Sequence, residues 1–178
     1  MSWAIDSSHT TLEFSVRHLG LSTVKGTFHR LSGEVDFDEE APAKSLGKVE
    51  VDVASIDTRD ERRDEHLRSA DFFDAANFPT ATFVTREIRH LHGDRFEVDG
   101  DLTIRGTTKP LTLEAELGEA IVDPWGNRRF AVTVRGEFNR TDFGLNWNQV
   151  LEAGRLMVGE KVRVQAEAEL VGAAAVAA

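Results

Sequence analysis

Strict alternation of apolar and polar residues over long segments is the feature that most constrains the fold of this chain. A period of two residues predicts strands that bury one face and expose the other. The outward faces carry charged side chains, so the sheet has to close on itself or pair with a second sheet. The alternation is plain in residues 10–18, 94–105, 111–117, 129–140 and 162–170.

Three further segments alternate less regularly and complete a set of eight predicted strands, all of which can be antiparallel. Strands of about eleven residues reach roughly 36 Å at ~3.3 Å per residue, which favours a tall, tilted barrel, although a sandwich also satisfies the pattern. In one weaker segment the phase slips after Phe28, which predicts a bulge near His29 and Arg30. The weaker segments are residues 22–38, 47–54 and 80–90.

One segment departs from the strand pattern and carries helix signals. Thr58, followed three residues later by Glu61, is a capping-box pattern that predicts a helix from about Arg59 to Ser69. Aromatic residues follow at once, so we expect a helical segment over about 59–75. The prediction is therefore an all-β fold, an extended eight-stranded antiparallel barrel with one short helical segment. Such a barrel is either filled by its own side chains or able to hold one small ligand.

The composition limits the partners and the location of the protein. The chain has 178 residues, a formal net charge of −10 and no cysteine. Disulfides and cysteine-ligated metals are excluded, and the acidity argues against a nucleic-acid partner. No apolar run approaches the ~20 residues of a membrane span and no leader pattern opens the sequence, so we expect a cytoplasmic protein. We predict one domain over residues 1–171 and a disordered tail over residues 172–178, with a homodimer left open.

Small and polar residues interrupt the inward-facing pattern. Gly100 and Gly136 fall in phase with the inward apolar residues, where they mark either bends of the sheet or space for an apolar ligand. His18 and Arg140 continue the inward pattern at strand ends. They belong either to a polar rim satisfied by the protein itself or to a mouth that holds the head group of a ligand.

Chemistry for catalysis is sparse in this sequence. No serine lies in a G-x-S-x-G elbow, and the alternating carboxylates are typical of solvated strand faces. His90 and His92 could ligate a metal, but they lie in an apparent hairpin loop, so we expect surface histidines. We expect no catalytic residue, no metal and no cofactor.

Several motifs, taken in order, are similar to those of the YceI-like family of bacterial lipid-binding proteins. The resemblance covers nearly the whole chain, from about Trp3 to Val171. It implies a lipocalin-like barrel that takes up a polyisoprenoid or a similar long-chain amphiphile. Some relatives are exported behind a signal peptide, a pattern that this sequence does not show. The motifs are residues 63–69 (RDEHLRS), 71–74 (DFFD), 78–79 (FP) ahead of Phe83, 100–110 (GDLTIRGTTKP) and 140–144 (RTDFG).

We therefore predict non-catalytic binding, storage or transport of an isoprenoid lipid, either a polyprenyl phosphate or an isoprenoid quinone. Arg63 and His66, on the predicted helix, either face solvent or join His18 and Arg140 at the head group. An enzyme acting on the lipid and a ligand-free structural barrel remain alternatives. The inward-face argument assigns the lipid tail to Phe14, Val16, Phe28, Phe72, Phe73, Val98, Gly100, Leu102, Leu113, Val134, Gly136, Phe138 and Val164.

Overall fold

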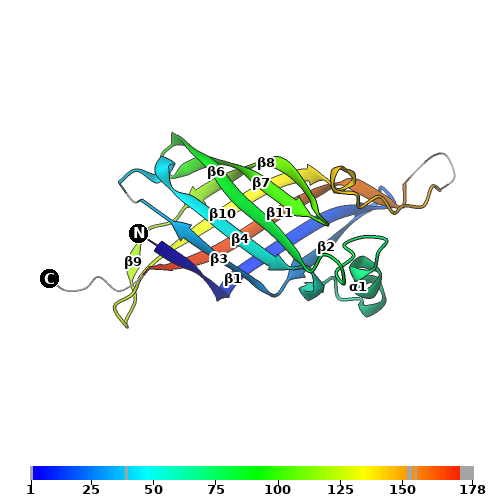
Figure 1. Ribbon diagram of the computed structural model, residues 1–178, viewed down its shortest axis with the longest axis horizontal. Helices are drawn as coiled ribbons and strands as arrows, with labels where there is room; N and C mark the ends of the chain where they lie inside the picture. The colour runs from blue at the N-terminus through cyan, green and yellow to red at the C-terminus, as the bar shows by residue number, and fades with distance from the viewer. Residues whose placement is uncertain (1, 39, 152–153, 155, 173–178) are drawn as a thin grey trace.

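The computed structural model describes residues 2–38, 40–151, 154 and 156–172 (Figure 1). One α-helix, α1 (Glu61–Arg68), and three short 3-10 turns, η1 (Pro42–Lys44), η2 (Val53–Ser55) and η3 (Arg140–Phe143), accompany the strands. The strands are β1 (Ser2–His18), β2 (Ser22–Phe28), β3 (Leu31–Asp36), β4 (Leu46–Asp52), β5 (Ile56–Asp57), β6 (Thr80–His92), β7 (Arg95–Ile104), β8 (Thr107–Leu117), β9 (Ile121–Val122), β10 (Arg128–Asn139) and β11 (Val158–Gly172).

The sheet closes into an antiparallel barrel. Its ring runs β1, β3, β4, β6, β7, β8, β10 and β11, and pairing between β11 and β1 closes it. The short strands β2, β5 and β9 extend this ring at its two ends. The predicted eight-stranded barrel is therefore confirmed, and the sandwich is excluded. Residues 173–178, most of the predicted tail, lie outside the described residues, whereas Gly172 belongs to β11.

The first strand serves both ends of the barrel. Its start pairs with β3 and its last seven residues pair with β2, while β11 runs beside it along most of its length. The prediction placed this strand at 10–18 and missed its first half, because the polar run from Asp6 to Thr10 hides the alternation. A register shift lies there: Asp6 accepts from the backbone N–H of Ser8 at 3.1 Å, and its carbonyl accepts from the Thr10 hydroxyl at 2.7 Å.

The phase slip near His29 and Arg30 is a break between β2 and β3 rather than a bulge within one strand. The backbone N–H of His29 donates to the carbonyl of Ser55 at 3.3 Å, and that of Arg30 donates to the Ser55 hydroxyl at 3.0 Å. These bonds replace the missing ladder bonds. The break changes the side-chain parity, so Phe28 before it and Leu31 after it both face the interior.

The helix begins later than the capping-box pattern predicted. Asp60 is the N-cap, and its carboxylate accepts from the backbone N–H of Arg63 at 3.1 Å. The prediction of Thr58 as the cap was wrong, because the Thr58 hydroxyl donates instead to Asp64. After Arg68 the chain continues in turns that bring Phe72 into a buried position.

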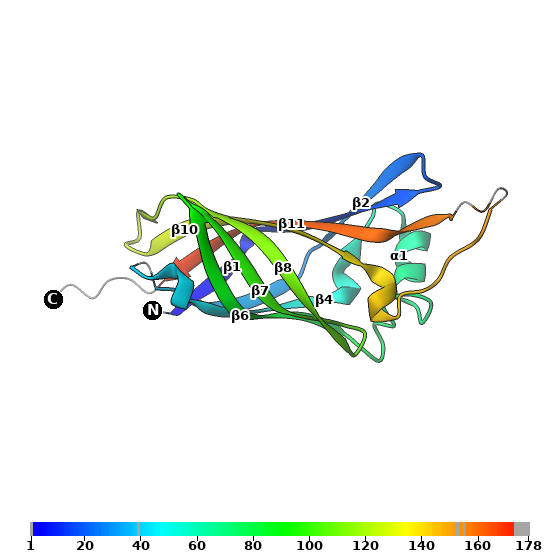
Figure 2. The ribbon, with the colours of Figure 1, turned by 90° about the horizontal axis from the view of Figure 1, so that it is seen from above.

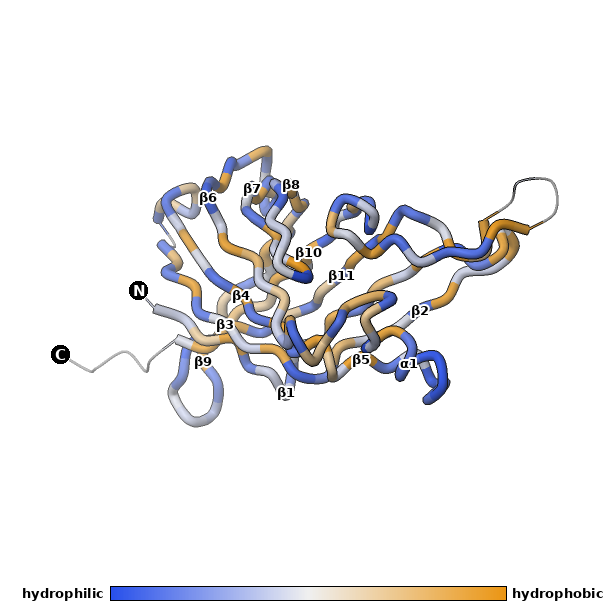
Figure 3. Tube along the Cα trace, turned by 45° about the vertical axis from the view of Figure 1, so that its right-hand side comes forward, coloured by the Kyte–Doolittle hydropathy of each residue, from blue (hydrophilic) through white to orange (hydrophobic). Residues whose placement is uncertain are grey.

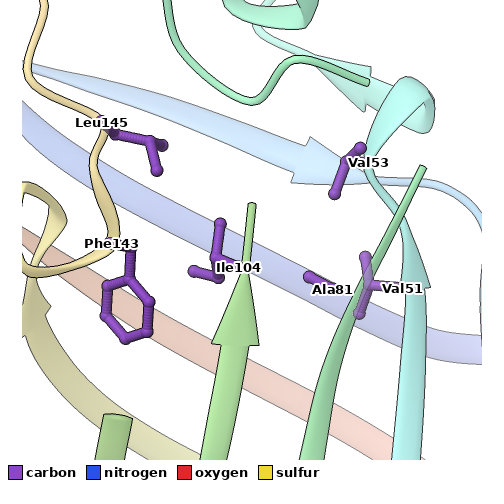
Figure 4. Packing of buried hydrophobic residues seen from close by; sticks show 6 residues of the cluster. All are labelled: Val51, Val53, Ala81, Ile104, Phe143 and Leu145. Carbon is purple, nitrogen blue, oxygen red and sulfur yellow. The ribbon is translucent and has the colours of Figure 1, made fainter. Parts of the chain in front are cut away.

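Two apolar clusters lie towards opposite ends of the barrel. Figures 1 and 2 show α1 at one end, and the start of β1 and the end of β11 at the other. Near α1, Phe143 and Leu145 from the segment after β10 pack beside Ile104 (Figure 4). At the opposite end, Trp3, Phe130 and Leu170 form the buried centre of the second cluster. The figure also labels the remaining buried members of the first cluster, Val51, Val53 and Ala81.

The outward faces of the long strands are mostly polar, as the alternation predicts. Apolar and hydrophilic residues alternate along the strands, and α1 is mostly hydrophilic (Figure 3). Arg89 on β6 pairs with Glu97 and Asp99 on β7, which is a cross-strand contact typical of a solvated sheet face. Within the described residues, no helix is long and apolar enough to cross a membrane.

Candidate ligand-binding cavity

An apolar cavity of about 810 Å³ occupies the barrel interior. It is lined both by residues of α1 and by Phe37 and Phe130 of the cluster at the opposite end, so it extends along the barrel. Its volume lies in the upper part of the ~300–1,000 Å³ range of small-molecule pockets. The predicted tail residues that line it are Phe14, Val16, Phe28, Phe72, Phe73, Val98, Leu102, Leu113, Val134, Phe138 and Val164.

The burial of the inward-facing side chains shows that the interior is not filled. Leu12, Val98, Leu102, Val134 and Val164 all face inward, yet each is only partly buried. In a solid core such residues would be closed off on every side. The sequence left a filled interior and an open one as alternatives, and the structure has the open one.

The two inward glycines do not line the cavity, so their assignment to the lipid tail is corrected. A Cβ atom at Gly100 would overlap the ring of Phe83, and one at Gly136 would overlap a methyl group of Leu113. Gly26 is covered by Phe14 in the same way. Each glycine therefore makes room for a large side chain of a neighbouring strand, a device that stabilises glycines in sheets.

Arg140 is buried at the mouth of the cavity and binds the protein's own backbone. Only 3% of the residue is exposed. Burial lowers the pKa of its guanidinium, and the negative charge of Glu160 opposes that shift. These contacts fit the alternative in which a rim residue is satisfied by carbonyls, and they do not leave the guanidinium free for a head group. Its N–H groups donate to the carbonyls of Leu145 (2.6 Å), Gly159 (2.8 Å), Trp147 (2.9 Å) and Val158 (3.2 Å).

A buried hydrogen-bond network fixes α1 across the mouth. The Asp64 carboxylate accepts from the backbone N–H of Thr58 at 2.9 Å and from its hydroxyl at 2.5 Å. Arg63 donates to the hydroxyl oxygen of Thr58 at 2.8 Å and to its carbonyl at 2.7 Å. Arg68 donates to the carbonyl of Ala54 at 3.0 Å and so ties the end of α1 to η2. Arg63 therefore has a structural contact besides its place in the cavity lining.

His66 lies between two aromatic rings at the mouth. Its ring centroid is 5.2 Å from that of Phe72 and 4.7 Å from that of Trp147, and its Nε2 atom lies 2.8 Å from Asp71. The Arg140 guanidinium lies over the ring of Phe72, 5.8 Å from the ring centre. The structure thus brings His66 and Arg140 together around Phe72.

The remaining predicted head-group residue, His18, lines the same cavity at the end of β1. The lining residues near this end that sequence reasoning missed include Arg17, Arg62, Trp147 and Met157. Trp147 and Met157 lie in irregular segments, where no periodicity marks a side chain as inward. Arg62 directly precedes the motif RDEHLRS on α1, and this position was the one signal in the sequence that could have marked it as a lining residue.

Histidines outside the cavity do not form a free metal site. His90 and His92 are exposed, as predicted. Elsewhere in the described residues, Asp6, His9 and Glu169 lie close enough to share an ion. However, Nη1 of Arg129 lies 2.8 Å from Asp6 and 3.1 Å from Glu169, so both carboxylates already pair with a guanidinium.

Comparison with known proteins assigns the family. A YceI-like domain model matches residues 3–170. Protein YceI of Escherichia coli O157:H7 is 40% identical over 140 residues, which are 79% of this chain and 73% of that protein. BcnA of Burkholderia cenocepacia has a similar structure, with a TM-score of 0.80, 22% identity and coverage of 93% of this chain and 98% of that chain.

A polyisoprenoid-binding domain from Saccharophagus degradans has the same fold, with a TM-score of 0.68 and 16% identity. That likeness covers 96% of this chain and 98% of the other. The family resemblance that the motifs indicated is confirmed by the domain match and by the E. coli relative. This chain belongs to the YceI-like family.

Proposed function

We propose that this protein binds and carries an isoprenoid lipid, a polyprenyl phosphate or an isoprenoid quinone, without changing it chemically. The observation that carries the proposal is the apolar cavity of about 810 Å³, which reaches from a polar mouth to an aromatic end. A long apolar tail buries most of its surface in such a space, and each buried CH₂ contributes about 0.8 kcal/mol. The related fold of a domain described as polyisoprenoid-binding supports the choice of lipid.

The charges at the mouth favour a phosphate over a quinone. Among the residues that line the cavity, the cations Arg17, Arg62, Arg63 and Arg140 outnumber the one carboxylate, Asp60. Arg62 and Arg63 are both exposed, but Nε and Nη2 of Arg63 donate to Thr58, so Arg62 is the better placed to reach a head group at the opening. Arg140 is engaged by carbonyls, and it contributes a positive charge close to the mouth rather than a free donor.

A matched pair of tryptophan substitutions tests the cavity. Val134 faces the cavity, whereas Arg135, the next residue of β10, is exposed on the outer face. Val134→Trp should fill the middle of the cavity and weaken binding of a polyprenyl phosphate at least tenfold. Arg135→Trp should leave the dissociation constant unchanged. Equal binding by both variants, with both shown to be folded by circular dichroism, would refute the proposed site.

The preference for a charged head group has its own test. Arg62→Gln should weaken binding of a polyprenyl phosphate about two- to fivefold, the size expected of an exposed ion pair. The corresponding polyprenol, which has no charge, should bind the variant as well as the parent. Equal weakening of both lipids would assign Arg62 to the packing of the mouth and not to the head group.

The absence of chemistry is a separate part of the proposal. His18 and His66 are the cavity-lining histidines that an enzyme could use as an acid/base pair. His66 is engaged by Asp71 and by two aromatic rings, which hold its imidazole in place. We expect the mass of a bound polyprenyl phosphate to stay unchanged over a day of incubation. Conversion that His66→Ala or His18→Ala abolishes would establish an enzyme instead.

Two finer predictions from the sequence concern the location of the protein in the cell and its oligomeric state. We propose a cytoplasmic location, which fractionation of cells that make the full-length protein measures directly. The choice between one chain and a homodimer is open, and sedimentation of the purified protein decides it.

A further inference from the structure

We propose that the aromatic cluster opposite α1 is a floor that limits the length of the isoprenoid tail. This inference rests on the proposed function and adds to it the residues that set how much of the tail the cavity can bury. Phe37 and Phe130 line the cavity at this end, whereas Trp3, which packs against both rings, does not. These two phenylalanine rings, with Pro42 and Ser45 of the η1 segment beside them, are therefore in the layer that a tail entering from α1 would meet at this end.

The rings of the floor are packed closely against one another. The ring centroids of Phe37 and Phe130 are 4.7 Å apart, and that of Trp3 is 4.8 Å from Phe130. Trp3 is completely buried, and the guanidinium of Arg128 lies 5.8 Å from its ring centre. A tail that reached this layer would have to displace two aromatic rings and then a buried indole.

The strand ladder holds the floor at a fixed depth. Phe130 on β10 is paired directly with Leu170 on β11, and Leu170 is paired with Ile5 on β1. Trp3, two residues before Ile5, is paired with Val35 on β3. Because these side chains belong to the consecutive paired strands β10, β11, β1 and β3, and Phe37 directly follows β3, the floor cannot retreat without loss of ladder bonds. A rigid wall of this kind sets the longest tail that the cavity can bury.

The two ends of the cavity differ in how they accommodate a longer tail. At the mouth, exposed Arg62 and Arg63 line the opening, so excess length can remain in solvent. At the floor, excess length meets packed rings. Affinity should therefore rise with each isoprene unit until the tail reaches the floor and then stop rising.

The test uses polyprenyl phosphates that differ by one isoprene unit and share one head group. With the parent protein, affinity should rise at least tenfold for each added unit up to a limiting length and stay level beyond it. Phe130→Leu should move this limit to a longer tail. Val132→Phe should move it to a shorter one, because Val132 lines the cavity beside the floor. Phe138→Leu, a change in the wall near Phe143, should alter affinity without moving the limit.

The outcomes separate the floor from the proposed function. If Phe130→Leu fails to fold, the opposite shift in Val132→Phe still tests the inference. An unchanged limit in every folded variant, with tight binding retained, would overturn the floor and leave lipid binding intact. Failure of the parent to bind any member of the series would overturn the proposed function, and the floor with it.

Discussion

Replacement of Arg140 by glutamine should damage the fold before it alters the choice of head group. The guanidinium donates to four carbonyls, and the substitution removes those donors. The carbonyl of Val158 keeps a second donor, the side-chain amide of Asn148 at 2.8 Å. The other three carbonyls therefore lose a hydrogen-bond partner, and each loss lowers the free energy of unfolding by about 1 kcal/mol or more.

Two gains offset part of that loss. The variant no longer buries a charge, and the glutamine amide can satisfy one of the carbonyls. We expect the free energy of unfolding to fall by about 2–4 kcal/mol, which lowers the melting temperature by roughly 4–16 °C for a domain of this size. Arg135→Gln, at an exposed arginine of the same strand, is the control and should melt within about 2 °C of the parent.

Calorimetry and two binding measurements together check the role of Arg140. Because the segment that Arg140 holds forms one wall of the mouth, a polyprenyl phosphate and the corresponding polyprenol should both bind the variant more weakly. The two factors should differ by no more than about fivefold, the contribution of one positive charge near an exposed mouth. An unchanged melting temperature with a tenfold loss for the phosphate alone would refute this reasoning. It would restore Arg140 as the head-group donor that its place in the sequence suggested.

Two further predictions concern stability. Gly100→Ala should lower the free energy of unfolding by about 1–3 kcal/mol, because a Cβ there would lie 2.6 Å from the carbonyl oxygen of Val84. Gly136→Ala should leave it nearly unchanged, since only a leucine methyl group has to rotate. Equal melting temperatures of the two variants would contradict this. Arg129 lowers the pKa of Asp123 to about 2, so the stabilisation it gives is complete above about pH 5 and is lost as the pH falls towards 2. In chemical denaturation, the deficit of Arg129→Gln relative to the parent should shrink over that range, and a deficit independent of pH would count against the ion pair.

The barrel could be predicted from the sequence because alternation reports which side of a strand is buried. The prediction from alternation failed where a strand carries polar residues on both faces. This is the case in the first half of β1, where the register shift between Asp6 and Thr11 breaks the period. It also failed at the helix start, because Thr58 and Asp60 are both good caps and only the fold decides which one is free.

The cavity wall could be predicted in the same way, since every inward apolar residue of a hollow barrel contributes to it. The glycines could not, because a missing side chain leaves space that a neighbour such as Phe83 can fill. Arg140 shows a related limit. Its inward position was visible, but its acceptors belong to Leu145, Trp147 and β11, and such long-range backbone contacts leave no local pattern in the sequence.

Organic extraction of the purified protein, followed by mass spectrometry, tests the central claim most directly. Protein isolated from a bacterial host under non-denaturing conditions should release close to one lipid with a long isoprenoid tail per chain. The cavity-filled variant Val134→Trp, isolated in parallel, should release little or none. A parent protein that carries no lipid and takes up no polyprenyl phosphate from detergent micelles would contradict the account, and so would equal amounts of lipid in the parent and in the filled variant.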